Sequence, residues 1–540
     1  MEIQALLRLA LALSKRAESY EPSHLANSFV EIGNVPALLR NNDSAVVFGR
    51  RGTGKTHLLS YLGQQLRDAG FVVAEVDMRT IGSSSGLYAD AGLALSERAT
   101  RLLRDTAGAI HERILEAYTA PGAKDFGPEV IASLDELLDA ANTVSVDGAV
   151  TREQAQQSNS EAGASAQLGF KFSGAGTTEI CGATGTSDKA TASESLKETT
   201  SGRPTLRINF AGLSSAIEKV VRNLPKRRIW ILLDEWSEVP LDLQPYLADM
   251  LRRGFLAVRG VTTKIAAIEH RSAFRLVDES SQRSVGMELG ADIAMSVNLD
   301  DHMVFDNDSR AASAFFAQVL YRHMRSISQS QGVVFEVTDA TELVRRMFTQ
   351  RDAFDEFVRA AEGVPRDAIN ILSKCALKAN SEKVSMPVVR DSARAWYATS
   401  KQNDVASRPR ALELLDWIKR EVIGNRRAPG FLLDARSRDG LIDFLFDSRV
   451  LHLIKKGISS KDREDAGTKF NAWVLDYGCY VELSNTGAAP RGLFEVEEDE
   501  GASATKFVDV PQNDYRSLRR AILDLSCFYT APNSIAPVIV

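Results

Sequence analysis

A glycine-rich segment followed by a lysine and a threonine is the part of this sequence best suited to chemistry. Gly49, four further residues, then Gly54, Lys55 and Thr56 satisfy the pattern of a phosphate-binding loop. Glycines let backbone N–H groups turn toward a polyphosphate, and the following helix points its positive dipole end at the anion. Lys55 is placed to reach the β- and γ-phosphates, and Thr56 to offer its hydroxyl to Mg²⁺.

The alternative for this segment is a glycine-rich turn before an ordinary helix. The apolar run 45–48 and the helical pattern 58–66 supply the strand and helix that a phosphate loop requires, so we favour the loop. The residues predicted to bind the nucleotide are Gly49, Arg50, Arg51, Gly52, Thr53, Gly54, Lys55, Thr56 and His57.

Two adjacent acids, Asp234 and Glu235, end a second apolar run at 228–233. Asp234 is predicted to bind Mg²⁺ together with Thr56, mainly through water, and Glu235 to polarise an attacking water. Many loops imitate an apolar run followed by two acids. The assignment of Asp234 and Glu235 is strengthened because they follow the phosphate loop in the order and at the distance expected for a nucleotide site.

Two arginines further along the chain are predicted to act on the same phosphates. The run 264–268 should form a strand beside the phosphate-loop strand, so that Glu269, His270 or Arg271 lies near a γ-phosphate. We favour Arg271, since a cation there binds the phosphate and reports its loss; the alternative is a charged surface loop. The helix that starts at Pro365 places Arg366 on its first turn, where it can fold over a nucleotide.

The elements that must position these residues form an α/β pattern. Strands are predicted at 45–48, 71–79, 228–234, 264–268 and 291–299, and helices at 58–66, 91–117, 216–224 and 243–253. The apolar N-terminal segment 1–40 is expected either to cover an adenine ring or to pack in the core. These patterns predict a parallel sheet with its binding crevice at the carboxyl ends of the strands.

The length of 540 residues suggests three or four units. We assign 1–300 to an α/β ATPase domain, 301–404 to a helical lid, 405–488 to a winged-helix-like domain, and 489–540 to an acidic linker and a last helix near 515–525. Residues 141–205 are more than half Ser, Thr, Gly or Ala and form a low-complexity insertion, either a flexible surface segment or a hairpin with a strand at 168–172.

The winged-helix interpretation of 405–488 depends on helices at 411–422, 441–446 and 449–456, followed by a strand at 470–482. Over 406–484 we count 14 Lys and Arg against 12 Asp and Glu, so the surface is not clearly cationic. Binding of double-stranded DNA and docking of a protein both remain open for this domain.

Composition narrows the class of protein. The net charge of -6 does not suit a general nucleic-acid binder, and no apolar stretch is long enough to cross a membrane. The four cysteines lie far apart without metal-ligand spacing, so a reducing cytoplasm is the expected location.

Taken in order, the two nucleotide motifs, the strand ending in Arg271, the helix start at Gly363–Arg366 and a terminal winged helix resemble the AAA+ superfamily over about residues 25–485. Within it they resemble the branch of origin-recognition and initiator ATPases, which includes bacterial origin-recognition-like proteins. The resemblance implies an ATPase with Arg366 as sensor 2, and oligomers in which a neighbour supplies an arginine finger. The candidates for that finger are Arg252, Arg253 and Arg283.

One departure points to a second hypothesis. Ile268–Arg271 lacks the polar Asn or Thr usual at sensor 1 of AAA+ proteins and is similar to the signalling STAND ATPases, in which an arginine ends this strand. We therefore expect a slow, partner-stimulated ATPase switch that uses ATP and Mg²⁺ and engages DNA or a protein. The alternative is a signalling or antiphage-defence sensor whose ATP-bound oligomer is the active state.

Overall fold

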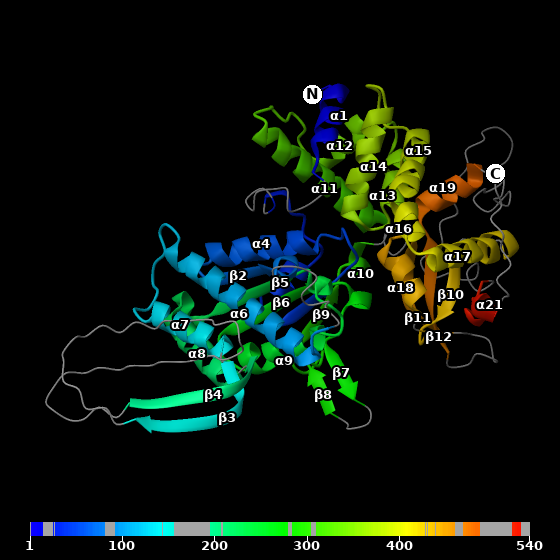
Figure 1. Ribbon diagram of the computed structural model, residues 1–540. Helices are drawn as coiled ribbons and strands as arrows, with labels where there is room; N and C mark the ends of the chain where they lie inside the picture. The colour runs from blue at the N-terminus through cyan, green and yellow to red at the C-terminus, as the bar shows by residue number, and fades with distance from the viewer. Residues whose placement is uncertain are drawn as a thin grey trace, which may run out of the picture.

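A parallel five-stranded sheet forms the centre of the structure, a computed structural model (Figure 1). The structure describes residue 25, residue 428 and the ranges 2–14, 27–81, 92–142, 144–155, 195–206, 209–278, 283–303, 309–426, 430–437, 439–459, 468–485 and 521–530. The helical lid lies above the sheet in Figure 1, and the C-terminal unit lies to its right.

The sheet has the order β2-β5-β6-β1-β9, and all its paired strands run parallel. The strands are β1 (Ala45–Phe48), β2 (Val72–Asp77), β5 (Ile229–Asp234), β6 (Val261–Ala267) and β9 (Met295–Asn298). Their apolar runs are buried on both faces, as in other parallel sheets. The predicted α/β P-loop core is confirmed, including the position of β6 directly beside β1.

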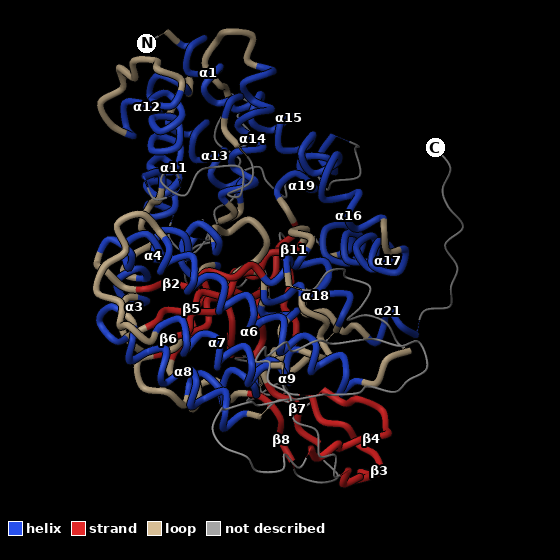
Figure 2. The backbone as a smooth tube through the Cα atoms, turned by 60° about the vertical axis from the view of Figure 1, so that its left-hand side comes forward, coloured by secondary structure: helices blue, strands red, loops and turns tan. Residues whose placement is uncertain are grey.

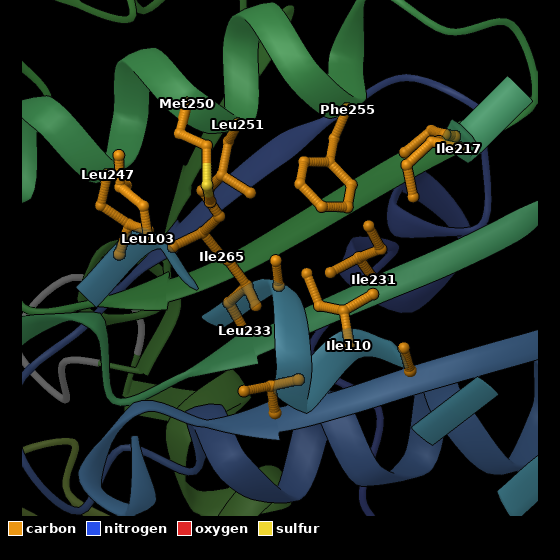
Figure 3. Close-up of a cluster of buried hydrophobic side chains, with 14 of the residues drawn as sticks. Leu103, Ile110, Ile217, Ile231, Leu233, Leu247, Met250, Leu251, Phe255 and Ile265 are labelled. Atoms are coloured by element: carbon orange, nitrogen blue, oxygen red, sulfur yellow. The ribbon is translucent and has the colours of Figure 1, made fainter. Parts of the chain in front are cut away.

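Alternate residues of each strand face two different layers of helices. Ile231 and Leu233 point into one core, which Figure 3 shows together with Leu247, Leu251 and Phe255. The helices of this layer are α6 (Leu95–Thr119), α7 (Val130–Ala141), α8 (Phe210–Asn223), α9 (Gln244–Met250) and the π-helical turn η5 (Leu251–Leu256).

The opposite face of the sheet packs on α3 (Val35–Leu39) and α4 (Lys55–Asp68). Trp230 and Leu232 point to this side, where Phe29 and Ile32 of the N-terminal segment join the same core. This part of the segment therefore packs in the core, and its contact with an adenine ring stays a prediction.

The lid consists of helices that follow the last strand of the sheet. They are α10 (Asp300–Met303), α11 (Ser309–Ser330), α12 (Ala340–Met347), α13 (Arg351–Ala361), α14 (Pro365–Lys378), α15 (Met386–Trp396), η7 (Tyr397–Lys401) and α16 (Gln402–Ala406). The first helix of the chain, α1 (Ile3–Ala12), buries Leu6, Leu7 and Leu9 in the lid core, and Figure 2 shows it beside these helices. Helix α1 therefore packs with the lid, although it lies within the range 1–300 that the sequence analysis assigns to the first domain.

The C-terminal unit contains an antiparallel sheet of order β10-β12-β11. Its elements are α17 (Pro409–Ile418), η8 (Lys419–Asn425), β10 (Gly430–Asp434), α18 (Gly440–Asp447), β11 (Leu451–Ser459), β12 (Lys469–Leu475), α19 (Tyr477–Asn485) and α21 (Ser526–Thr530).

Two predictions in this unit are wrong. The segment 449–456 was expected as a helix, but from Leu451 it is strand β11, because it pairs with β12 and short apolar runs do not distinguish the two states. The expected strand 470–482 ends at Leu475, because Asp476 accepts a hydrogen bond from the Gly478 N–H at 3.0 Å and the chain turns into α19. The winged-helix assignment is therefore not confirmed, although the β11–β12 pair is present.

Two further strand pairs project from the core (Figure 1). Strands β3 (Val144–Ala155) and β4 (Ser195–Leu206) pair within the low-complexity insertion, whereas the predicted strand 168–172 lies outside the described residues. Strands β7 (Arg275–Asp278) and β8 (Arg283–Gly286) form a pair that was not predicted.

The last predicted helix, 515–525, is wrong where the structure describes it. Residues 521–525 are not helical, because Ile522 bridges to Leu432 of β10, and α21 begins only at Ser526. Residues 486–520, including the acidic run, lie outside the described part of the chain. None of the described helices is long and apolar enough to cross a membrane.

Candidate nucleotide-binding site

The carboxyl ends of the five parallel strands meet at one edge of the sheet. There the chain places the loop 49–54 after β1, the acids Asp234 and Glu235 at the end of β5, and the 3₁₀ turn η6 (Glu269–Arg271) after β6. Segments that are far apart in the sequence therefore share one site, as is usual for open α/β sheets.

The loop 49–54 has the backbone of an anion cradle. Gly52 and Gly54 have φ angles of 89° and 93°, which side chains rarely tolerate. A Cβ on Gly52 would also lie 2.7 Å from the Cβ of Arg366, and one on Gly49 would lie 2.5 Å from Thr53 Oγ1. Only glycine therefore allows the loop to keep this shape against its neighbours.

Lys55 lies buried at the start of α4. Its Nζ donates to the carbonyl oxygens of Gly49 at 2.8 Å and Arg50 at 3.1 Å. Burial lowers the pKa of this ammonium, and the nearby carboxylates of Glu235 and Asp234 oppose that shift. An anion in the loop would favour the charged form of Lys55 in the same way, so the residues fit a polyphosphate.

The two acids of β5 lie next to this loop. Burial raises the pKa of Asp234, and a hydrogen bond with the Thr56 side chain opposes the shift. Burial and the charge of Asp234 also raise the pKa of Glu235. A cation beside these carboxyl groups would favour their ionised forms, so the residues fit a divalent metal held by Thr56 and Asp234.

Glu235 has an unusual backbone. Its φ of 54° and ψ of 40° are left-handed, and its N–H donates to Asp234 Oδ1 at 2.9 Å. Such a conformation costs about 1–3 kcal/mol in a residue other than glycine and persists only where the surroundings enforce it. Strain of this kind often marks a functional position.

The three residues of η6 are bound by other parts of the protein. Arg271 Nε donates to Asp447 Oδ2 of α18 at 2.6 Å, and His270 Nδ1 lies 3.2 Å from Asp443 Oδ1. Glu269 accepts from Lys456 of β11 at 3.2 Å. The predicted sensor turn therefore joins the C-terminal unit, and a contact of Arg271 with phosphate stays a prediction.

The start of α14 lies directly against the phosphate loop. The Arg366 N–H donates to Gly52 O at 3.2 Å, and the charge of Arg366 helps to lower the pKa of Lys55. The structure thus places Arg366, on the first turn of α14, against the loop, while the contact of Pro365 and Arg366 with a nucleotide stays a prediction.

Arg50 has a role that the sequence did not reveal. Its buried side chain donates from Nε to Asp300 Oδ1 at 2.8 Å and from Nη2 to the Glu362 carbonyl at 3.1 Å. Nη1 lies 2.6 Å from His452 Nδ1 of β11. No local pattern signals these partners, because they lie hundreds of residues away along the chain.

The other predicted residues have separate surroundings. His57 contacts the Leu25 carbonyl and the ring of Phe29, on the side of the N-terminal segment. Arg51 forms an exposed ion pair with Glu238 at 2.6 Å. Arg252 and Arg253 both bind Asp249, at 2.7 and 2.8 Å, and the side chain of Arg283 lies outside the described part of the structure.

Comparison with known proteins gives one family match. Residues 12–69 match the family model described as ORC-CDC6-like, and this segment contains the phosphate loop and α4. The predicted resemblance to origin-recognition ATPases is confirmed for this segment. No curated protein matches the chain.

Several solved structures are similar to the chain at low scores. A RuvB variant of Thermotoga maritima has a TM-score of 0.30 at 8% identity and covers 87% of this chain and 95% of its own. Cdc6p of Pyrobaculum aerophilum has a TM-score of 0.31 at 12% sequence identity, and the match covers 87% of this chain and 98% of Cdc6p. The ORC1 protein of Aeropyrum pernix, solved in complex with DNA, has a TM-score of 0.27 at 12% sequence identity. This match covers 90% of this chain and 97% of the ORC1 chain. All three TM-scores lie below 0.5, so the fold assignment rests on the strand order and the phosphate loop.

Proposed function

We propose that this protein is an ATP-binding and ATP-hydrolysing switch of the AAA+ type, which assembles with other protomers and engages DNA or a protein partner. One observation carries the proposal: Lys55, Thr56, Asp234 and Glu235 meet at one edge of the sheet beside a loop in which Gly49 and Gly52 have no room for a Cβ. The ORC-CDC6-like match over the same loop supports it.

Each residue has a distinct task in this proposal. The N–H groups of the loop and the Lys55 ammonium bind the phosphates and offset their negative charge. Thr56 and Asp234 hold Mg²⁺, which when bound neutralises charge that develops on the phosphate oxygens. Water completes the ligand set in this proposal, since Mg²⁺ usually keeps several waters when a protein binds it through one or two side chains.

Glu235 accepts a hydrogen bond from the attacking water and thereby orients it. A carboxylate performs this task in its ionised form, whereas burial alone favours the protonated form. Lys55 is close enough to lower the Glu235 pKa, so the same ammonium that binds phosphate helps to keep the base ionised. Arg366, next to Gly52, adds positive charge from the lid side of the loop.

The signalling alternative has one observation in its favour. All three side chains of η6 contact β9 or the C-terminal unit, and Arg271 binds Asp447. Such contacts suit a sensor in which the C-terminal unit is held closed and is released on activation. In that case the ATP-bound oligomer, rather than turnover, is the output.

Mass photometry of the Glu235→Gln protein with ATP and Mg²⁺ tests the proposal and separates the two versions. Assembly that grows with a DNA duplex, and weakens as salt is added, supports the switch that engages DNA. Assembly with ATP that ignores DNA and needs a protein trigger supports the sensor. A protein that neither binds ATP nor assembles under any of these conditions overturns both.

A further inference from the structure

A buried glutamine, Gln244, joins two parts of the candidate site. It is the first residue of α9, and its side chain is fully buried between the loop after β5 and the turn after β6. Its Oε1 accepts from Trp236 Nε1 at 3.2 Å and from the Ala273 N–H at 2.7 Å. Its Nε2 donates to the carbonyl oxygens of Val239 at 2.8 Å and Arg271 at 3.0 Å.

These four partners fix the orientation of the amide. Two N–H donors face one end of the side chain and two carbonyl acceptors face the other, so only one assignment of oxygen and nitrogen satisfies them. The hydrogen-bonding capacity of the amide is completely used. No other side chain of similar size presents two acceptor sites and two donors from neighbouring atoms.

The segments that Gln244 joins are the ones that carry the predicted chemistry. Trp236 directly follows Glu235, and Arg271 is the last residue of η6. A second bridge runs in parallel, because Ser237 Oγ accepts from the Ile268 N–H at 2.7 Å and lies 3.1 Å from Ser272 Oγ. The loop that begins at Glu235 is therefore bound to the end of β6 at two points.

The position of Glu235 depends on the contacts that hold the loop after β5 in place. Its left-handed backbone is unfavourable, so the loop would relax if its contacts were removed. The Trp236 ring is itself buried and stacks on Phe274, with ring centroids 5.1 Å apart. Packing and the hydrogen bond to Gln244 together hold the ring, and Gln244 also binds the Arg271 carbonyl, so this one side chain links the Glu235 loop to η6 alongside the Ser237 bridge.

We infer that Gln244 is a positioning residue, which holds the loop of the water-orienting Glu235 at a fixed place relative to η6. The inference rests on the proposed ATPase function. Gln244 touches neither phosphate nor metal in this scheme; it acts through the backbone of Arg271 and through Trp236. A shift of about 1 Å in a catalytic group can lower the rate on the order of 100-fold, while ATP affinity, set by the loop 49–54, is unchanged.

Two substitutions test the inference. Gln244→Met keeps the size of the side chain and removes all four hydrogen bonds. Gln244→Glu keeps the shape and the acceptor oxygen, but at neutral pH it places a carboxylate against two carbonyl oxygens. Gln350→Glu, at an exposed position, is the matched control for the change in charge.

The measurements are ATP affinity, kcat and the dependence of kcat on pH. We expect kcat to fall about 30- to 100-fold in both variants while ATP affinity stays within about 2-fold of the unaltered protein. Relative to the unaltered protein at each pH, Gln244→Glu should recover part of its kcat as the pH is lowered, since a protonated acid can donate to a carbonyl again. Gln244→Met should not recover, and the control should follow the unaltered protein.

The outcomes separate the inference from the proposed function. If the unaltered protein binds ATP but hydrolyses none, the ATPase proposal fails and the inference fails with it. If it hydrolyses ATP and both variants keep kcat within about 2-fold, the positioning role alone is overturned. If Gln244→Met does not fold, the pH dependence of Gln244→Glu decides. A kcat that rises relative to that of the unaltered protein as the pH is lowered supports the positioning role. A ratio of the two kcat values that does not change with pH overturns it.

Discussion

Arg50 of the phosphate loop lies 2.6 Å from His452, measured from Nη1 to Nδ1, although 402 residues separate them in the sequence. Because the guanidinium is always a donor, His452 must accept at Nδ1 and carry its proton on Nε2, which lies 3.4 Å from Asp476 Oδ2. The imidazole is therefore neutral. It connects the phosphate loop to a buried ion pair of Asp476 with Lys401 in the C-terminal half of the protein.

His452 should make the folded protein sensitive to acid. Burial, together with the charges of Arg50 and Lys401, lowers the His452 pKa to about 4, against an ordinary value of 6.5. The unfolded chain thus binds more protons below pH 6.5, and stability falls as the pH drops from 6.5 to about 4. The full loss is about 3 kcal/mol for this one group. Urea unfolding of His452→Gln, which cannot titrate, should show a flatter profile over this range.

The comparison must be made between variants, because other buried histidines act in the same direction. Burial lowers the pKa of His323 to about 3. His323→Gln should also flatten the profile, but without loosening the contact between Arg50 and the C-terminal unit. If the His452→Gln profile matches that of the unaltered protein, His452 is not held neutral by this contact.

Lys401 is predicted to be essential for stability. It is buried between two carboxylates, 3.0 Å from Asp367 and within hydrogen-bond reach of Asp476. Lys401→Met would leave those charges buried with fewer cations, at a cost of about 3–5 kcal/mol. Lys378→Met removes an exposed pair with Asp391 at 4.0 Å and should cost less than about 1 kcal/mol. Similar unfolding midpoints for the two variants would contradict the prediction.

The α/β P-loop core could be predicted from the sequence because its signals are local. The phosphate loop lies within one stretch of eight residues, and the two strands that carry it and the paired acids, β1 and β5, are continuous apolar runs up to Asp234. The adjacency of β6 to β1 then followed from the general architecture of parallel sheets.

The contacts around Arg50 and Gln244 could not be predicted, because nothing local marks them. Arg50 looks like any other residue of a phosphate loop. Gln244 looks like any other residue at the start of a helix, followed by a proline. Their partners are set by how β6, the lid and the C-terminal unit meet. Likewise β11 was mistaken for a helix, since its pairing with β12 decides its state and is not encoded in its own short pattern.

Lys55→Ala should remove ATP binding. The substitution deletes the buried ammonium and with it a charge-assisted hydrogen bond to phosphate, so we expect affinity to fall at least about 100-fold. Calorimetric titration with ATP and Mg²⁺ measures the change, and Lys124→Ala, at an exposed position, is the control. Unchanged affinity would remove the assignment of the phosphate loop.

Glu235→Gln should separate binding from turnover. The amide has the size of the carboxylate but cannot polarise water as a base, so ATP affinity should persist while phosphate release falls at least about 100-fold. Glu382→Gln, an exposed change in the lid, should leave both quantities unaltered. Normal turnover in Glu235→Gln would show that another residue orients the water.

The low-complexity insertion should be dispensable for the core. Val144 of β3 pairs directly with Leu206 of β4, so the chain leaves α7 and returns toward α8 at neighbouring points. Residues 145–205 can therefore be replaced by a short Gly-Ser turn without stretching either helix, since paired strand residues have Cα atoms only about 5 Å apart. We expect the shortened protein to bind ATP with the affinity of the full chain and to melt within a few degrees of it. An insoluble product, or one that has lost ATP binding, would show that the insertion supports the core, and a replacement that abolishes only assembly would instead place the partner contact on this hairpin.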